Sequence, residues 1–532
     1  MASYMWADCG FYPISNVIIL LQRSLVEIGD GNQFQMHDQL RDLGVNIVHR
    51  ENVENPLRRS RIWSNPQALE LLSREKVAEK LKVIDLTKCY NMTRLPCFPT
   101  SGSLEILNLS CLMLRSADLD LGNLSNLKVL LLKGGGVRKI TGGTIGVLKQ
   151  LRELDVTEFR CENLGEALAD IGELQVLKHL RASGTDIVAT HGTRAGIRLP
   201  TSLKELITSS PIANLSELIE METLVVRDCS YGLEIPPADT MWWKLSKLKS
   251  MELYGTRMTT TISLRPFRLL PSTLTRLDIH CHELRRLPSL ASLSTLCKFH
   301  SFGCPHLAEI QGIEGLKSLQ VLSIMSEDSL SLLEGLETLL SFNKLQTLQI
   351  QGCPLLTSLS SHVQQQLGDG VLDSLRELSI GGSALLLKTS FGQMLHLSKF
   401  SRLLELELEQ TEADDVDKEL LLEGLESLEE LTRLTLRGLA IQKLPSLSKL
   451  QKLEALIVTG ASNLREIEGI EDLKSLEWLV LSSCTSFETL PEGLSGLKRL
   501  RQVNIEGSTN LTGLSALSYL PPNVYVWGPN LL

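Results

Sequence analysis

Residues 476–484 read Leu-Glu-Trp-Leu-Val-Leu-Ser-Ser-Cys, which is the pattern L-x-x-L-x-L-x-x-C. Leu479 and Leu481 lie two residues apart, so they point to one side of an extended strand, whereas Val480 and Ser482 point to the other side. A single strand with one apolar side cannot bury that side by itself. The pattern therefore predicts that this stretch stacks on further copies of itself.

Copies of this pattern recur along the chain, with starts that are 18 to 30 residues apart. They begin at Leu81, Leu104, Leu127, Leu151, Leu177, Leu203, Met221, Leu248, Leu274, Leu296, Leu319, Leu345, Leu375, Leu403, Leu431, Leu453, Leu476, Leu500 and, in degenerate form, near Pro521. Nineteen copies in register cover more than four fifths of the chain. They predict an α/β fold, a leucine-rich-repeat solenoid with a curved parallel sheet on its concave face.

Charge and hydropathy narrow the range of partners. The formal net charge is −9, which argues against a surface for nucleic acid. No apolar run approaches the ~20 residues of a membrane span. The first residues also lack the basic start and apolar core of a signal peptide. We therefore expect neither a nucleic-acid nor a membrane partner.

The chain has eleven cysteines, and five of them stand at the ninth position of the pattern, where the chain turns out of the strand. These five are Cys89, Cys229, Cys304, Cys353 and Cys484. Their placement predicts buried, reduced thiols in a cytosolic protein, since a secreted module would show paired cysteines.

Residues 1–50 do not follow the repeat. Residues 14–21 have helical apolar spacing, and residues 25–28 and 33–36 read as two strands joined by a tight turn. Asp38 is a suitable N-cap for a second helix over about 39–50. This order, helix, hairpin and helix, is that of the end of a winged-helix domain. We predict a partial winged-helix domain over 1–50, a linker over 51–80 and about nineteen repeats over 81–532.

Two stretches resemble plant nucleotide-binding leucine-rich-repeat immune receptors. Residues 34–44, Phe-Gln-Met-His-Asp-Gln-Leu-Arg-Asp-Leu-Gly, resemble the M-H-D motif of that family. Residues 59–63, Arg-Ser-Arg-Ile-Trp, followed by Leu-Glu-Leu-Leu at 69–72, resemble the linker of its Toll/interleukin-receptor-type (TIR) class. One departure is Gly-Val-Asn at 44–46, where the family usually has Gly-Arg and an acidic residue.

The resemblance assigns a nucleotide contact to the first stretch. It implies that His37 contacts the β-phosphate of ADP and that Asp38 is its cofactor-site neighbour and a helix cap. The chain contains no G-x-x-x-x-G-K-[ST] loop to cradle phosphates. We therefore expect the chain to begin partway through the nucleotide switch and to hold no cofactor by itself, although the full-length family binds ADP or ATP.

A candidate partner surface comes from the seventh position of the pattern, which faces the concave side. In four successive repeats it holds Tyr254, His280, Phe302 and Met325, which we call the stripe. Neighbouring strands lie about 4.8 Å apart, so these side chains would be continuous. Exposed, adjacent aromatic side chains are typical of interaction surfaces. The alternative is that the stripe packs within the chain itself.

A second candidate partner surface is charged. Glu405, Glu407 and Glu409 alternate along one strand, and the next strand carries Arg433 and Arg437. The aligned positions predict two lateral ion pairs, Glu405 with Arg433 and Glu409 with Arg437, each of small energetic value. Glu377 adds a like charge beside Glu405, which leaves room for a basic partner.

Two other groups of residues invite a chemical interpretation. The histidines and cysteines of the segment 280–306 include metal-ligand types, namely His280, Cys281, His282, Cys297, His300, Cys304 and His306. We expect no metal site, because the repeat alignment places His282 and Cys304 at inward turns and the other histidines at unrelated positions, and there is no C-x-x-C pair. Arg58, Arg59 and Arg61 form a basic cluster that is either a solvated part of the linker or a contact to acidic repeat edges.

These observations favour a recognition and autoinhibition module of an intracellular plant immune receptor. Its partner would be a pathogen effector or the receptor's own nucleotide-binding domain, in the cytoplasm or the nucleus. We expect no enzymatic activity, because no motif of a nucleophile, metal or phosphate site is present. An alternative is a repeat scaffold that presents partners to a separate enzyme such as a ubiquitin ligase. An extracellular receptor ectodomain would need a signal peptide and paired cysteines.

Overall fold

The computed structural model describes two compact units, residues 1–221 and 222–532, and each is described here by itself. The described residues are 26–29, 33–36, 38–54, 59–62, 81–87, 102–114, 116–185, 198–209, 215–227, 244–255, 270–282, 284–333, 344–356, 373–382, 397–410, 422–490, 492–511 and 524–528, together with Cys89, Met92, Leu95, Gly335, Leu336, Leu517 and Leu520.

The first unit begins with a hairpin and a helix. Strands β1 (Val26–Gly29) and β2 (Gln33–Met36) pair antiparallel, as the sequence predicts. Helix α3 (Asp38–Glu51) follows directly, and its last turn carries two basic side chains that suit the negative end of the helix dipole. The expected first helix, over 14–21, lies outside the described residues.

A parallel sheet then runs through the first unit. Its strands are β3 (Arg61–Ile62), β4 (Val83–Asp85), β5 (Ile106–Asn108), β8 (Val129–Leu131), β11 (Glu153–Asp155), β12 (His179–Ala182) and β13 (Glu205–Thr208). Each strand pairs in parallel with the next. Strand β3 was not expected, because its two residues fall in the stretch that the sequence assigns to a linker. The sheet therefore starts about twenty residues before the first predicted repeat.

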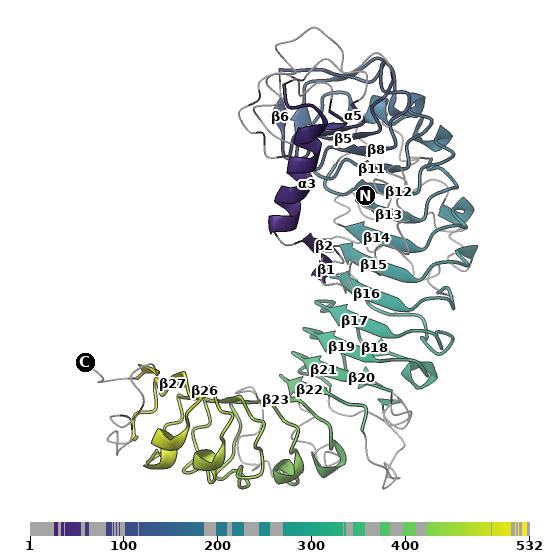
Figure 1. Ribbon diagram of the computed structural model, residues 1–532. Helices are drawn as coiled ribbons and strands as arrows, with labels where there is room; N and C mark the ends of the chain where they lie inside the picture. The colour runs from purple at the N-terminus through teal and green to yellow at the C-terminus, as the bar shows by residue number, and fades with distance from the viewer. Residues whose placement is uncertain are drawn as a thin grey trace. The chain divides into compact units, whose positions relative to one another are not determined.

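The second unit repeats the same arrangement with longer strands (Figure 1). They are β14 (Thr223–Arg227), β15 (Ser250–Gly255), β16 (Arg276–Cys281), β17 (Lys298–Phe302), β19 (Val321–Met325), β21 (Thr347–Gln351), β22 (Glu377–Gly381), β23 (Glu405–Glu409), β24 (Arg433–Arg437), β25 (Ala455–Thr459), β26 (Trp478–Ser482), β27 (Gln502–Asn504) and β28 (Tyr525–Trp527). All neighbouring pairs are parallel.

The motif explains where these strands lie. Each of the eighteen starts from Leu81 to Leu500 is followed two residues later by the first residue of a strand. The first, fourth and sixth positions face inward, as Leu476, Leu479 and Leu481 illustrate, all fully buried. In register, Leu479 pairs with Leu456 and Leu481 with Val458. Stacking thus completes the core that no single repeat can form, and it confirms the predicted parallel solenoid fold.

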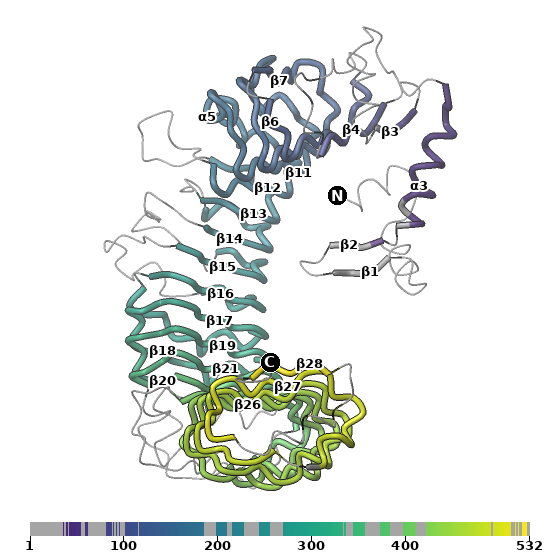
Figure 2. The backbone as a smooth tube through the Cα atoms, turned by 90° about the vertical axis from the view of Figure 1, so that its left-hand side faces the viewer, coloured from purple at the N-terminus to yellow at the C-terminus, as the bar shows by residue number. Residues whose placement is uncertain are grey.

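Between strands the backbone returns through short turns on the far side of each coil (Figure 2). In the second unit many of these turns are single 3₁₀ turns, such as η10 (Leu425–Ser427). Gly424 precedes η10 with a φ of 86°, and a Cβ there would lie 2.5 Å from the backbone nitrogen of Ser398. Only glycine fits where adjacent coils approach so closely. Among the described residues, no helix is both long and apolar enough for a membrane span.

Candidate functional site

The stripe lies on the outward side of four neighbouring strands of the second unit. Register pairs Tyr254 with His280 and Phe302 with Met325. The inward positions beside them are filled by buried side chains, including Leu277, Ile279, Leu322 and Ile324. Because those positions already form the core, the seventh position is left to face outward. Phe302 is 47% exposed, and the other three members are half-buried.

The rings of the stripe contact one another edge to face. The Tyr254 and His280 ring centroids are 6.2 Å apart, and those of His280 and Phe302 are 4.9 Å apart. Such geometry matches the quadrupoles of aromatic rings and fixes their orientation before any partner arrives. Burial raises the pKa of the Tyr254 hydroxyl, with the nearby Glu252 carboxylate adding to the effect. The stripe is therefore an ordered apolar surface.

Arg227 extends the stripe by one strand. It pairs in register with Tyr254, and its guanidinium carbon lies 5.4 Å from the centre of the Tyr254 ring. This distance is within the range of a cation–π contact. Arg227 was not predicted as part of the stripe, although it occupies the seventh position of the repeat that starts at Met221. The same positional rule would have found it.

A buried acidic residue lies one row away from the stripe. Asp278 Oδ2 accepts two hydrogen bonds from the guanidinium of Arg276, from Nε at 3.0 Å and from Nη2 at 2.6 Å. Its Oδ1 is buried with no hydrogen-bond partner in the described part of the chain. His300 pairs with it in register, and burial lowers the pKa of the His300 imidazole. Arg276 thus holds the Asp278 carboxylate in place beside the stripe.

The acidic surface differs from its prediction in one pair. Arg437 Nε donates to Glu407 Oε1 at 3.3 Å, so the expected pair of Arg437 with Glu409 is wrong. Glu407 also accepts Gln351 Nε2 at 3.1 Å and the Ser379 hydroxyl at 3.0 Å. Glu407 therefore accepts hydrogen bonds from three donors on three strands, with Gln351 and Ser379 on Oε2 and Arg437 on Oε1. The network makes Glu407 a structural group at this point of the sheet.

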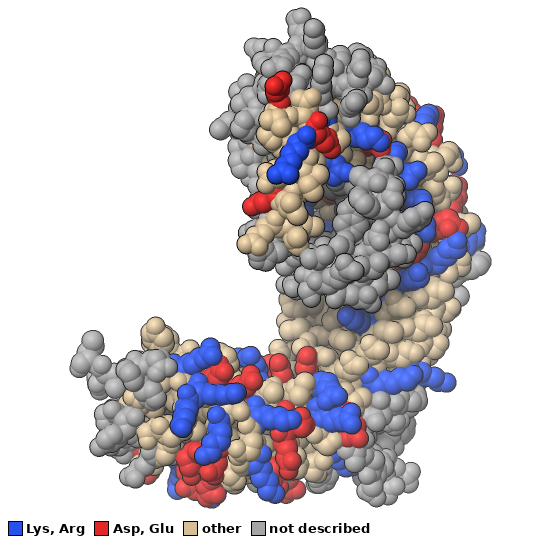
Figure 3. Space-filling model, in the orientation of Figure 1, with Lys and Arg blue, Asp and Glu red and all other residues tan. Residues whose placement is uncertain are grey.

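The other expected pair is present but weak. Arg433 Nε lies 4.0 Å from Glu405 Oε2, and both side chains are about half exposed. Exposed pairs of this kind contribute little to stability. In Figure 3, acidic and basic side chains gather over β23 and the strands after it, whereas the surface around β17 and β19 is largely uncharged.

The residues that the resemblance assigns to nucleotide cannot be placed in a site. His37 lies outside the described residues, and of Asp38 the structure describes only that α3 begins there. The nucleotide contact stays a prediction.

The basic cluster of the linker is not solvated at Arg59. This side chain is only 3% exposed, and it donates from Nε to the backbone oxygen of Asn52 at 2.7 Å and from Nη2 to that of Val53 at 3.1 Å. Both carbonyls follow the end of α3. Ser60 adds a second tie, because Glu51 accepts its N–H at 2.7 Å and its hydroxyl at 2.9 Å. These contacts tie the linker to the end of α3 just before it leads into β3.

The histidine and cysteine residues of the segment 280–306 also need one correction. His282 is exposed, and Cys281 beside it is buried, so the inward turn of this repeat is made by Cys281. The Cys281 backbone N–H donates to Cys304 Sγ at 3.3 Å. In the described part of the chain, no three His, Cys, Asp or Glu side chains come together as a metal site would require.

Cysteines at the ninth position are buried thiols where the structure describes them, namely at Cys89, Cys304, Cys353 and Cys484. Burial raises the pKa of Cys304 and of Cys353 to about 12. Cys229 lies outside the described residues. The eight described cysteines are all free.

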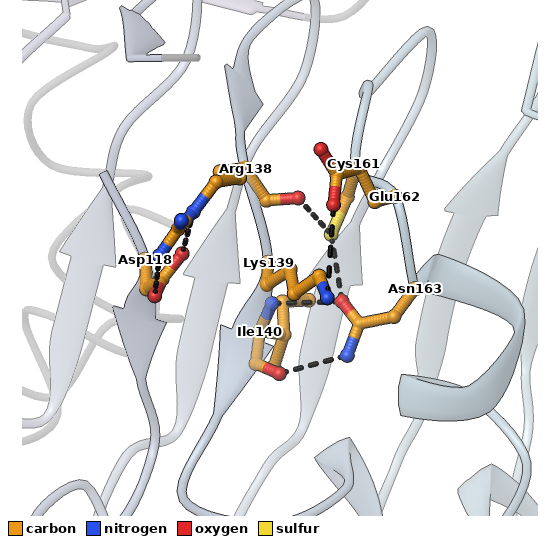
Figure 4. A network of polar contacts seen from close by, with 7 residues as sticks. All are labelled: Asp118, Arg138, Lys139, Ile140, Cys161, Glu162 and Asn163. Carbon is orange, nitrogen blue, oxygen red and sulfur yellow. Dashed lines mark hydrogen bonds and ion pairs between the residues drawn. The ribbon is translucent and has the colours of Figure 1, made fainter. Parts of the chain in front are cut away.

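A polar cluster in the first unit consists of side chains that hydrogen-bond one another and the neighbouring backbone (Figure 4). Arg138 forks onto Asp118, with Nε 2.9 Å from Oδ1 and Nη2 2.6 Å from Oδ2, and this contact lowers the pKa of Asp118. Asn163 bonds both the N–H and the carbonyl of Ile140, each at 2.9 Å. The Cys161 thiol donates to Asn163 Oδ1 at 3.2 Å. The side chains replace backbone pairing beside the small sheet of β7 (Leu119–Asp120) and β10 (Ile140–Thr141).

Comparison with known proteins finds one matching family model and several curated relatives that are similar over part of the chain. Residues 3–52 match the family described as "Disease resistance protein Roq1-like, winged-helix domain". The Arabidopsis thaliana disease resistance protein RRS1B is 37% identical over 68 residues, which are 13% of this chain and 5% of that protein. Disease resistance protein RRS1 of the same plant is 28% identical over 238 residues, which are 44% of this chain and 15% of that protein.

A solved structure, "Crystal structure of a TDR receptor", overlaps with 84% of this chain and 85% of its own at 15% identity and a TM-score of 0.45. So low a score adds nothing to the fold assignment, which rests on the strands themselves. The chain spans less than a fifth of the curated relatives named above. It is a leucine-rich-repeat protein that carries a match to the Roq1-like winged-helix domain and is similar, over part of its length, to plant disease resistance proteins.

Proposed function

We propose that this chain is the recognition and autoinhibition module of an intracellular plant immune receptor of the TIR class. It is not an enzyme. It binds a protein partner, either a pathogen effector or the receptor's own nucleotide-binding domain, through the outward face of the sheet in the second unit. The Arg-Ser-Arg-Ile-Trp linker at 59–63 supports the TIR class, and the free cysteines support a location in the cytoplasm or the nucleus.

One observation carries the proposal. The seventh-position side chains form an ordered aromatic surface that the core does not use, with Phe302 about half exposed at its centre. A solenoid gains little stability from large apolar groups in such positions. Aromatic anchors of this kind supply much of the free energy in protein interfaces, where truncation costs ~2 kcal/mol or more. The surface therefore suits a protein partner better than it suits self-packing.

The test removes the rings and measures binding and folding separately. The double variant Tyr254→Ala with Phe302→Ala should weaken binding of a plant resistance protein's nucleotide-binding domain, added in trans, and leave the melting temperature nearly unchanged. Val147→Ala with Ile219→Ala removes two exposed apolar side chains from the first unit and serves as the matched control. Unfolding of the stripe variant with retained binding would show that the stripe is packing.

A further inference from the structure

Glu409 stands in the same row as the stripe and has no partner among the residues that the structure describes. The register of the seventh positions runs from Met325 to Gln351, then to Gly381 and to Glu409. Glu409 is half-buried, and within the described ranges it has no hydrogen bond or ion pair, whereas Arg437, the cation in register with it, is bound to Glu407. A half-buried carboxylate gains more from a cation than an exposed one does, because water screens it less.

The absence of a side chain at Gly381 determines where the Glu409 carboxylate lies. A Cβ built on Gly381 would be 2.7 Å from Glu409 Cβ and 3.1 Å from Glu409 Oε2. The Glu409 side chain therefore leans toward Gly381 of β22. This brings the charge nearer to the stripe. Any larger residue at 381 would occupy that space.

The separation between the apolar and acidic parts follows from the strand order. Strands β17, β19, β21 and β22 are consecutive neighbours, so Phe302 and Gly381 are three steps apart, or about 14 Å. Met325 is two steps away, or about 10 Å. An extended peptide advances ~3.3 Å per residue, and residues four apart project from the same side about 13 Å apart. Gln351, which lies between, is already bonded to Ser379 and Glu407.

From this geometry we propose that the partner presents an extended segment with an apolar side chain on Phe302 and Met325 and, four residues away, an Arg or Lys side chain on Glu409. The inference rests on the proposed function and specifies the chemistry of the partner. Charge complementarity selects the basic residue, since the neighbouring carboxylates Glu405 and Glu407 already face Arg433 and Arg437. The uncharged surface around β17 and β19 selects the apolar one.

The experiment uses the full chain and fluorescent decapeptides of Gly and Ser that carry one Leu and one Arg. The spacing between Leu and Arg is three or four residues, and a Leu–Asp peptide with a four-residue spacing is the charge control. The four-residue Leu–Arg peptide should bind about tenfold more tightly than either of the others, which corresponds to a single well-placed charge contact. Glu409→Gln should abolish this preference and flatten the dependence of binding on salt. Glu429→Gln, an exposed carboxylate in the turn after η10, is the matched control and should change neither.

Each result has one meaning. Equal binding of the Leu–Arg and Leu–Asp peptides, equal binding at both spacings, or no peptide binding below about 1 mM overturns the proposed partner chemistry. A Glu409→Gln variant that keeps the preference for Arg also overturns it. In all of these cases the proposed function stands if the Tyr254→Ala and Phe302→Ala double variant still weakens binding of the nucleotide-binding domain. If that variant binds the nucleotide-binding domain normally, the proposed role of the stripe in binding that domain has failed.

Discussion

Glu327 accepts the backbone N–H of Cys304 through Oε2 at 3.0 Å, although 23 residues separate them in the chain. Glu327 stands at the ninth position of the repeat that starts at Leu319, where other repeats place cysteine. Its other oxygen accepts the Ser301 hydroxyl at 2.7 Å, and the side chain is fully buried. The carboxyl thus links two successive coils inside the solenoid. The sequence analysis did not single it out, although the repeat alignment places it there.

Burial raises the pKa of Glu327 to about 7, and hydrogen bonds from Ser301 and Cys304 oppose this rise. A raised pKa means that the stability Glu327 contributes is complete below pH 4.5 and is lost as the pH rises toward 7. Asp328 adds to the rise, and the Cys304 and Cys353 thiols nearby remain protonated in this range. Between pH 4.5 and 7.5 we expect the free energy of unfolding of the wild-type chain to fall by up to about 3 kcal/mol relative to that of Glu327→Gln. Urea unfolding of both proteins at the two pH values measures this difference. An equal change in unfolding free energy for both proteins would refute the prediction.

Two phenylalanines of strand β17 should respond in opposite ways to truncation. Phe299 is fully buried and Phe302 is 47% exposed. Phe299→Ala should cost about 3–5 kcal/mol of unfolding free energy because it leaves a cavity. Phe302→Ala should cost under about 0.5 kcal/mol. Chemical denaturation of the two variants gives the comparison directly, and similar losses would mean that Phe302 belongs to the core.

Truncation of Arg59 should loosen the junction between α3 and β3. Arg59→Ala removes two hydrogen bonds from a buried guanidinium to the carbonyls of Asn52 and Val53, each worth about 0.5–1.5 kcal/mol. Amide hydrogen exchange over residues 38–51 should accelerate while the strands of the second unit keep their protection. Arg50→Ala, an exposed arginine in the last turn of the same helix, is the control. Unchanged hydrogen exchange in α3 would show that the hydrogen bonds of Arg59 do not stabilise this helix.

The thiols should react with iodoacetamide in the order of their exposure. Among the described cysteines, Cys111 is exposed and should be alkylated first in the native chain. Cys304 and Cys353 should stay unmodified, because they are buried and a pKa of about 12 leaves almost no thiolate at neutral pH. Peptide mass mapping before and after addition of denaturant checks this order. Early labelling of Cys304 would mean that the coils of the second unit open readily.

The sequence by itself was sufficient for the strands that follow the repeat motif, although it did not predict β3. Leucines two residues apart must share one side of a strand whatever surrounds them, so the motif predicts each of these strands and its buried positions, as at Leu479 and Leu481. The same parity places the stripe on the outward side, with Phe302 exposed. These features depend only on the alternation of side chains along a strand. Contacts from distant parts of the chain do not alter that alternation, so the repeated motif predicts them.

Only the tertiary structure decided which long polar side chains meet. Arg437 binds Glu407 and not its register neighbour Glu409. Ser379 and Gln351 bond Oε2 of Glu407, which leaves Oε1 to the arginine, and Gly381 leaves space for the Glu409 side chain. Arg59 is buried for a similar reason, since its carbonyl partners belong to the end of another element. Flexible side chains choose partners by distance in three dimensions, and a repeat alignment records only which residues share a row.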